Sequence, residues 1–157
     1  MKKLILPAIL MVALVSCKKE VVVEEVVPTI PEKEVTEIPV SEECYLGIMK
    51  KDTVSLKLEI KGDQVISGNM STKYYQKDKN EGTLYGEMKG DTLYADYTFT
   101  SEGILSVRQV AFLKKGDTFV EGFGEVVGDK KGKVNFKDKK ALKFDNSTVL
   151  KKVDCKM

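Results

Sequence analysis

Short polar–apolar strands separated by tight turns dominate the sequence after residue 50, and this pattern most restricts the fold. From Thr53 to Ile60 polar and apolar residues alternate without a break, which is typical of a strand with one wet face. Gly-Asp pairs begin at positions 62, 90 and 116, and each precedes a similar strand-like stretch. Glycine accepts positive φ and aspartate bonds its own backbone, so these pairs predict hairpin connections.

Nine strands are predicted, at residues 44–49, 53–60, 63–72, 82–89, 91–100, 104–114, 117–127, 132–137 and 149–154. Helical periodicity is nearly absent, apart from one turn at residues 140–144. Sequential antiparallel strands twist and must hide their edges, which favours closure into a small up-and-down β-barrel of eight or nine strands. A two-sheet β-sandwich is the alternative. Gly68, Gly86, Gly122 and Gly124 fall inside the predicted strands, where a barrel often needs a kink or a close backbone approach.

The composition changes at about residue 44, which predicts one domain preceded by a tether. Residues 18–43 contain three prolines, no glycine, no aromatic residue, and eight glutamates against three lysines. Such a segment is expected to be extended, with a short strand or helix within 20–27 as the alternative. Residues 44–157 carry 21 basic and 16 acidic residues, a net charge of +5, and suffice for one compact domain.

The N-terminus has the order of an export signal. Lys2 and Lys3 precede an almost wholly apolar run at residues 4–15, which ends in Leu14-Val15-Ser16-Cys17. The run is shorter than the ~20 residues of a spanning helix. These residues resemble the signal of bacterial lipoproteins, which implies cleavage of residues 1–16 and lipidation of Cys17. An ordinary signal with a chance cysteine is the alternative. Lys18, where aspartate would favour inner-membrane retention, makes the outer membrane the expected location, on either its periplasmic or its surface side.

Cys44 and Cys155 remain once Cys17 is assigned to the lipid. In an oxidising envelope, an even pair at the two ends of a domain predicts a disulfide. A reactive or metal-binding thiol is the competing interpretation, but the chain has no Cys-x-x-Cys and no histidine.

The missing residue types restrict the function more than those present. Without histidine there is no imidazole base, no Ser-His-Asp triad and no typical zinc or copper site. No glycine-rich phosphate loop follows a strand. Asp96, Glu102 and Glu121 could supply a glycosidase pair, but nothing distinguishes them from ordinary strand or loop acids. We therefore expect a protein that is not an enzyme and that uses no cofactor or metal.

Arg108 is the most distinctive candidate for a site. It is the only arginine in the chain, and it lies within a predicted strand in an apolar run. A planar, multi-donor group there predicts pairing with Asp96, Glu102 or Glu121. Arg108 is then either a structural salt-bridge partner or an anchor for an anionic ligand. Tyr97 is expected to line that ligand site, and the loop at 73–81 to act as its lid.

In architecture the predicted domain resembles lipocalin- or calycin-type barrels displayed on lipoproteins, such as periplasmic lysozyme inhibitors and copper-responsive envelope lipoproteins. The resemblance implies either of two functions. The first is a binding module for a small amphipathic or anionic envelope molecule. The second is a structural protein with a filled barrel that docks another envelope protein, including a cell-wall hydrolase that it inhibits. The copper-binding Cys-x-x-Cys is missing, and a charge of +5 opposes cationic lysozyme. We expect a monomer that contacts the membrane through its lipid and binds no nucleic acid. Inward-facing Leu56, Leu58, Met70, Met88 and Phe99 that meet would favour the docking protein, and a cavity around Arg108 the binding module.

Overall fold

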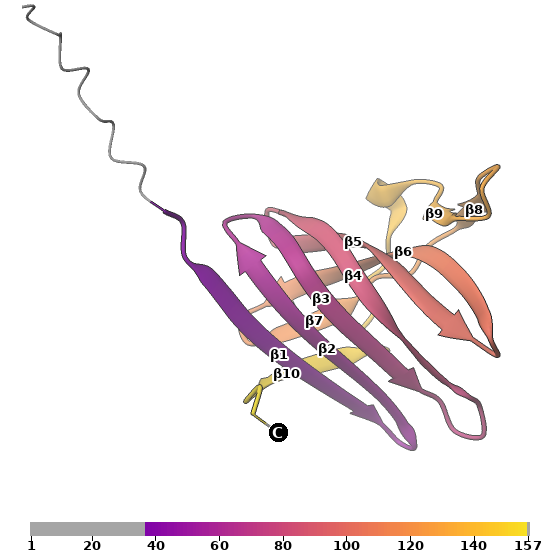
Figure 1. Cartoon of the computed structure of the whole chain (residues 1–157), viewed down its shortest axis with the longest axis horizontal. Helices are drawn as coiled ribbons and strands as arrows, with labels where there is room; N and C mark the ends of the chain where they lie inside the picture. The colour runs from indigo at the N-terminus through magenta and orange to yellow at the C-terminus, as the bar shows by residue number, and fades with distance from the viewer. Residues whose placement is uncertain (1–36, 157) are drawn as a thin grey trace, which may run out of the picture. The chain divides into compact units, whose positions relative to one another are not determined.

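The computed structural model describes residues 37–156, and almost all of its regular structure is β-strand (Figure 1). The predicted signal at 1–16, the lipidation of Cys17 and the tether up to residue 36 lie outside the described residues. No helix in the described part is long and apolar enough to cross a membrane. The strands are β1 Val40–Met49, β2 Asp52–Lys61, β3 Gln64–Lys73, β4 Lys79–Lys89, β5 Thr92–Ser101, β6 Ile104–Lys115, β7 Thr118–Glu121, β8 Val126–Gly128, β9 Val134–Phe136 and β10 Val149–Val153.

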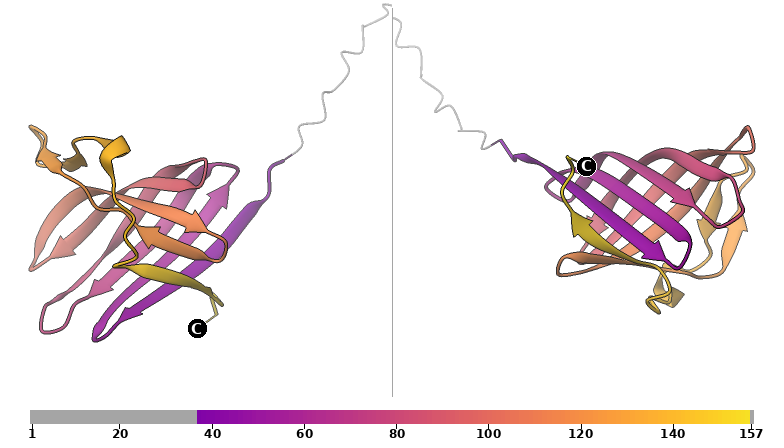
Figure 2. Two further views of the ribbon diagram at one scale, coloured as in Figure 1. Left: turned by 180° about the vertical axis from the view of Figure 1, so that it is seen from behind. Right: turned by 90° about the horizontal axis from the view of Figure 1, so that it is seen from below.

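Eight of these strands close into an antiparallel barrel, which confirms the predicted fold and excludes the β-sandwich. β1 to β7 pair in chain order, β10 pairs with both β7 and β1, and β5 pairs with β6 (Figure 2). The hairpin turns at Gly62, Gly90 and Gly116 all have positive φ, as their Gly-Asp pairs predict. The alternation of polar and apolar residues therefore turns the apolar face of each strand toward the interior of the barrel.

The inward face forms one hydrophobic core that fills the barrel. Leu56, Leu58 and Met70 are buried within it, and Met88 and Phe99 pack against it. The buried members of the cluster are Tyr45, Val54, Leu56, Leu58, Val65, Met70, Leu84, Leu93, Ala95, Tyr97, Val110, Phe112, Phe119 and Leu150. The five residues expected to meet if the barrel is filled do meet.

Two glycines of β4 allow the neighbouring strand to approach unusually closely. A Cβ atom on Gly82 would overlap the carbonyl oxygen of Thr98 in β5, and one on Gly86 would overlap that of Tyr94. Gly86 was expected to mark such an approach, whereas Gly82 was not distinguished in the sequence. Both positions require the smallest residue because backbone atoms cannot move aside cheaply.

The disulfide prediction is confirmed. Cys44 and Cys155 are bonded, with sulfurs 2.17 Å apart and Cα atoms 5.2 Å apart. Cys44 lies opposite Val153 in β10, so the bond joins the first strand to the residues that follow the last.

The first strand begins at Val40, and the predicted domain boundary at residue 44 is therefore too late. The segment from Val40 to Glu43 pairs with β2 as far as Lys61. Val40, Ser41 and Glu42 are exposed and the segment resembles a tether in composition, but its backbone pairing with the end of β2 keeps it in the sheet.

The prediction of strands at 117–127 and 132–137 within the barrel wall is wrong. β7 ends at Glu121, and residues 122–148, which we call the outer segment, leave the wall before β10 returns to it. The outer segment contains the β8–β9 hairpin and a short 3-10 helix at Lys139–Ala141. Gly122 and Gly124 lie directly against the side chains of Phe144 and Leu142, so these glycines serve the outer segment and not a strand.

Because the outer segment leaves the wall, one side of β6 is paired with a barrel strand over only part of its length. β7 pairs with only the last four residues of β6, Phe112–Lys115. Further toward the start of β6, the one strand pairing on that side is between Arg108 and Val134 of β9. On this side, β7 therefore pairs with four of the twelve residues of β6, and β9 of the outer segment pairs with Arg108 alone.

Candidate ligand-binding site at Arg108

Arg108 lies over a pair of stacked aromatic rings inside the barrel. It is opposite Tyr97 of β5, whose ring stacks on Phe99 with centroids 4.6 Å apart. The guanidinium carbon is 5.8 Å from the Tyr97 ring centroid and 5.5 Å from that of Phe99. Aromatic faces attract a cation at such distances.

The Arg108 side chain has no carboxylate in contact. None of the ion pairs found within residues 37–156 includes it. Its Nε is buried and has no hydrogen-bond partner in this part of the chain. Most buried polar groups are satisfied, so a single unpaired guanidinium nitrogen marks a position where an acceptor is missing.

Glu121 is the carboxyl whose pKa responds to the charge of Arg108. It ends β7 and is only 6% exposed. Burial raises the pKa of this carboxyl, while the charge of Arg108 and a hydrogen bond with Thr148 act in the opposite direction. The two groups therefore influence each other without an ion-pair contact.

Tyr74, directly after β3, is the other polar neighbour. Burial and the charge of Glu121 raise the pKa of its hydroxyl, and Arg108 partly offsets this through its charge and a hydrogen bond. The loop that begins with Tyr74 spans residues 74–78, a shorter segment than the predicted lid at 73–81. This loop lies at the same end of the barrel as Arg108.

The structure brings together three of the five predicted site residues, namely Arg108, Glu121 and Tyr97. Tyr97 is fully buried and donates a hydrogen bond from its hydroxyl to the Met70 carbonyl (3.1 Å). Burial raises the pKa of this hydroxyl to about 12, so Tyr97 is a neutral ring beneath Arg108, but it does not line the adjoining cavity as the sequence predicted.

Asp96 and Glu102 do not join them, and their predicted pairing with Arg108 is wrong. Asp96 adjoins the inward-facing Tyr97, so strand alternation turns it to the outer face, where it accepts a bond from Lys133 Nζ (2.6 Å). Glu102 is exposed in the β5–β6 turn with a φ of 50°. It lines a separate hollow of about 400 Å³ at the barrel mouth together with Tyr74.

A cavity of about 190 Å³ lies beside Arg108 under the outer segment. Arg108 and Glu121 contribute its charged lining. Its apolar lining comes from Val110 of β6 and from four residues of the outer segment, namely Phe123, Val126, Val134 and Phe136. Sequence reasoning missed these four because they were assigned to barrel strands. The cavity is amphipathic, with an arginine at one side and an apolar wall at the other.

The opposite end of the barrel holds a fully paired polar cluster. Glu43 accepts hydrogen bonds from the Tyr45 hydroxyl (2.7 Å), Lys152 Nζ (2.9 Å) and Lys114 Nζ (3.1 Å). Each polar group of this cluster has a hydrogen-bond partner, so we regard the cluster as structural. Arg108 differs, because its Nε has no such partner in the described residues.

The closest grouping of possible metal ligands in the described residues is Glu42, Cys44 and Cys155. The two sulfurs are bonded to each other, which removes both thiolates, and Glu42 is paired with Lys57. This grouping is therefore unsuited to a metal while the disulfide is formed.

The fold and site together define a class: a closed, eight-stranded antiparallel barrel with a filled core and, toward one end, an arginine whose Nε has no hydrogen-bond partner in residues 37–156. Comparison with protein-family models, with curated proteins and with solved structures gave no match for this chain. The functional argument therefore depends on the chemistry of the site.

Proposed function

We propose that this protein is a lipid-anchored component of the bacterial cell envelope, and that its barrel binds a small amphipathic or anionic molecule at Arg108. Lipidation of Cys17 would hold it at the outer membrane. The described chain enters the barrel at the start of β1, where Val40 lies opposite Lys61, and Arg108 lies toward the other end. The proposed ligand end is thus remote from the tether.

The buried Nε of Arg108, which has no hydrogen-bond partner in the described residues, supports this proposal most strongly. A carboxylate or phosphate ligand would supply the acceptor that Nε lacks, in the bidentate geometry that suits arginine. The adjoining apolar wall of Phe123, Val134 and Phe136 suits a hydrocarbon portion. At about 190 Å³ the cavity is below the size of common ligand pockets, so it fits a headgroup and a short apolar part.

The proposal includes no catalysis. The chain has no histidine, and Asp96 and Glu121 lie on opposite faces of the barrel wall, so they cannot flank one scissile bond.

Native mass spectrometry of the full-length chain, made in a bacterial envelope and extracted in mild detergent, tests this function. We expect a co-purifying adduct whose mass identifies the ligand, and its loss in Arg108→Ala. Arg108→Lys keeps the charge but not the planar fork, so it should retain the adduct only in part. Glu121→Gln removes the competing carboxylate and should retain the adduct fully. Lys151→Ala, an exposed lysine of β10, is the matched control for charge and should behave as wild type.

An adduct that survives Arg108→Ala unchanged, or a bare wild-type peak, would overturn the binding function. Either result would favour the second candidate, a docking protein for another envelope component such as a cell-wall hydrolase. Two observations support that candidate. The core is filled, and Ile104 and Leu105 are 68% and 70% exposed on the thinly covered part of β6. A photo-crosslinker at Leu105, compared with one at Lys151, would capture such a partner.

A further inference from the structure

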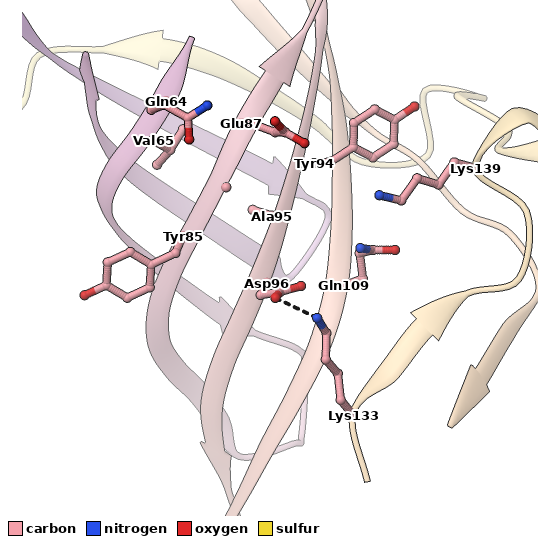
Figure 3. Close-up of a pocket in the computed structure, with 11 residues that line it drawn as sticks. Gln64, Val65, Tyr85, Glu87, Tyr94, Ala95, Asp96, Gln109, Lys133 and Lys139 are labelled. Carbon is pink, nitrogen blue, oxygen red and sulfur yellow. Dashed lines mark hydrogen bonds and ion pairs between the residues drawn. The ribbon is translucent and has the colours of Figure 1, made fainter. Parts of the chain in front are cut away.

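A second candidate site lies on the outer face of the barrel, apart from Arg108. An open groove of about 470 Å³ runs over β4, β5 and β6 (Figure 3). Lys133 and Lys139 of the outer segment line the opposite edge of the groove. Tyr85, Asp96 and Lys133 line neither the Arg108 cavity nor the hollow at the barrel mouth, whereas Gln109 lines both this groove and the Arg108 cavity.

Strand register arranges its floor in two rows of side chains. Tyr85, Asp96 and Gln109 lie directly opposite one another across β4, β5 and β6. In the next row, Glu87 lies opposite both Gln64 of β3 and Tyr94 of β5. Neighbours in such rows have their Cβ atoms roughly 5 Å apart, so each row spans about the width of a sugar ring and its hydroxyls.

One aromatic ring of this floor, that of Tyr85, is available to a ligand. The Tyr85 side chain is 58% exposed although it lies in the middle of a strand. Tyr94 is half-buried, with Lys139 Nζ 4.8 Å from its ring centroid. An exposed ring face offers an apolar, weakly negative surface to the C–H groups of a ligand.

The planar polar groups are held in place but keep capacity for further bonds. Asp96 uses Oδ2 for Lys133, which leaves Oδ1 as an acceptor. Gln109 uses Oε1 to accept from the Phe136 amide (3.4 Å), which leaves its NH₂ group as a donor. A fixed acceptor beside a fixed donor suits hydroxyl groups, which both donate and accept.

The charges of the groove balance, which argues against an ionic ligand. Asp96 is paired with Lys133, and Glu87 is paired with Lys89 at 2.7 Å. Lys139 lies over the Tyr94 ring and also acts on Glu87. The groove is lined by two carboxylates, Glu87 and Asp96, and by two lysines, Lys133 and Lys139, so the net charge of its lining is zero, although Lys139 forms no ion pair within the described residues.

We propose that this groove binds a neutral carbohydrate chain, with one sugar ring on Tyr85 and the hydroxyls of an adjoining ring bonded to Asp96 and Gln109. Exposed aromatic surface, hydroxyl-matching planar groups and a net charge near zero together fit a sugar better than a lipid or an anionic polymer. Tyr85 lies outside the Arg108 cavity, so the result for Tyr85→Ala does not depend on the function proposed there.

Isothermal titration calorimetry on the full-length chain in mild detergent tests the proposal with three neutral probes: cellohexaose, maltohexaose and chitohexaose. We expect at least one to bind, about tenfold weaker binding in Tyr85→Ala, and a comparable loss in Gln109→Ala. Tyr75→Ala is the matched control, because Tyr75 is 52% exposed in the β3–β4 loop and outside the groove. It should bind as wild type.

The proposal is wrong if none of the probes binds at 10 mM (about −2.7 kcal/mol). Equal affinities of the wild type and Tyr85→Ala would overturn it too. Selective binding of polygalacturonate over the neutral probes would contradict the balanced charge and assign the groove to an acidic polymer. Circular dichroism of each variant will show that the barrel is intact.

Discussion

At the scale of single residues, the pKa of a carboxyl is shifted in opposite directions at the two ends of the barrel. Burial alone would raise the pKa of the Glu43 carboxyl, but hydrogen bonds from Tyr45, Lys152 and Lys114 outweigh it and lower the pKa to about 2. At the other end, burial keeps the pKa of Glu121 above its ordinary value despite Arg108. Glu43 therefore stabilises the fold when ionised, and Glu121 destabilises it when ionised.

These opposite pKa shifts predict that neutralising each carboxyl changes the stability of the fold in opposite directions. Glu43→Gln should lower the free energy of unfolding at pH 7 by about 1–3 kcal/mol, the range for hydrogen bonds to charged groups. The folded-state pKa of Glu43 is depressed, so its contribution is complete above pH 4.5 and is lost as pH falls toward 2. The difference between Glu43→Gln and wild type should therefore shrink in that window.

For Glu121 the sign is reversed. Its folded-state pKa is raised, so the wild type loses stability as pH rises from 4.5 through that pKa. Glu121→Gln should consequently be at least as stable as wild type at pH 7 and should gain no advantage below pH 4.5. Urea unfolding at pH 3, 5 and 7 measures both variants. A more stable Glu43→Gln at pH 7, or a strongly destabilised Glu121→Gln, would contradict the assignment.

The sequence singled out Arg108 because an arginine within an apolar strand is unusual, and it offered Glu121 as one of three possible partners and Tyr97 as lining of the site. Asp96 was grouped with them wrongly, although alternation excludes it, since it is adjacent to the inward-facing Tyr97. Its true partner, Lys133, is 37 residues away in the outer segment, and no local pattern predicts that contact.

At the scale of elements, β4 is the strand most dependent on its glycines. A Cβ atom on Gly82 would meet the backbone of Thr98 and Phe99, whereas one on Gly128 in β8 would meet nothing within 4 Å. Gly82→Ala should therefore destabilise the fold by about 1–3 kcal/mol, the usual cost of overpacking. Gly128→Ala is the matched control and should change stability by less than about 0.5 kcal/mol.

Thermal unfolding of both glycine variants measures this difference. Equal melting temperatures would show that β5 can move away from β4 without cost. A loss in Gly128→Ala as large as that in Gly82→Ala would show instead that any added methyl group is harmful, whatever its contacts.

Most elements could be predicted because turn chemistry and alternation are local properties. The Gly-Asp turns place β2 to β6 within a few residues of their observed bounds. The outer segment could not be predicted, because Gly122 and Gly124 are compatible with a strand and only their contacts with Phe144 and Leu142 show otherwise. The cavity wall next to Arg108 was missed for the same reason.

At the scale of the whole molecule, closure of the barrel depends on a thin seam. β1 and β2 pair through ten residue pairs, whereas β10 pairs with β1 through three and with β7 through three. The disulfide between Cys44 and Cys155 lies at this seam and closes a loop with a sequence separation of 111 residues. Its two cysteines could be paired from the sequence because barrel closure brings the first and last strands together.

Loss of the disulfide should therefore weaken the seam more than the rest of the barrel. In Cys44→Ser/Cys155→Ser we expect the free energy of unfolding to fall by about 2–5 kcal/mol, as for other long loops. Hydrogen exchange should accelerate first in the amides of β10 and β7, which have few pairs, while those of β2 to β5 keep their protection relative to global unfolding. Acceleration by one common factor in all strands would contradict this expectation, because it would mean that the barrel opens only as a unit. Faster exchange that is confined to β10 and β7 would support it, because it would mean that these two strands open locally, next to the Arg108 cavity, while the rest of the barrel stays closed.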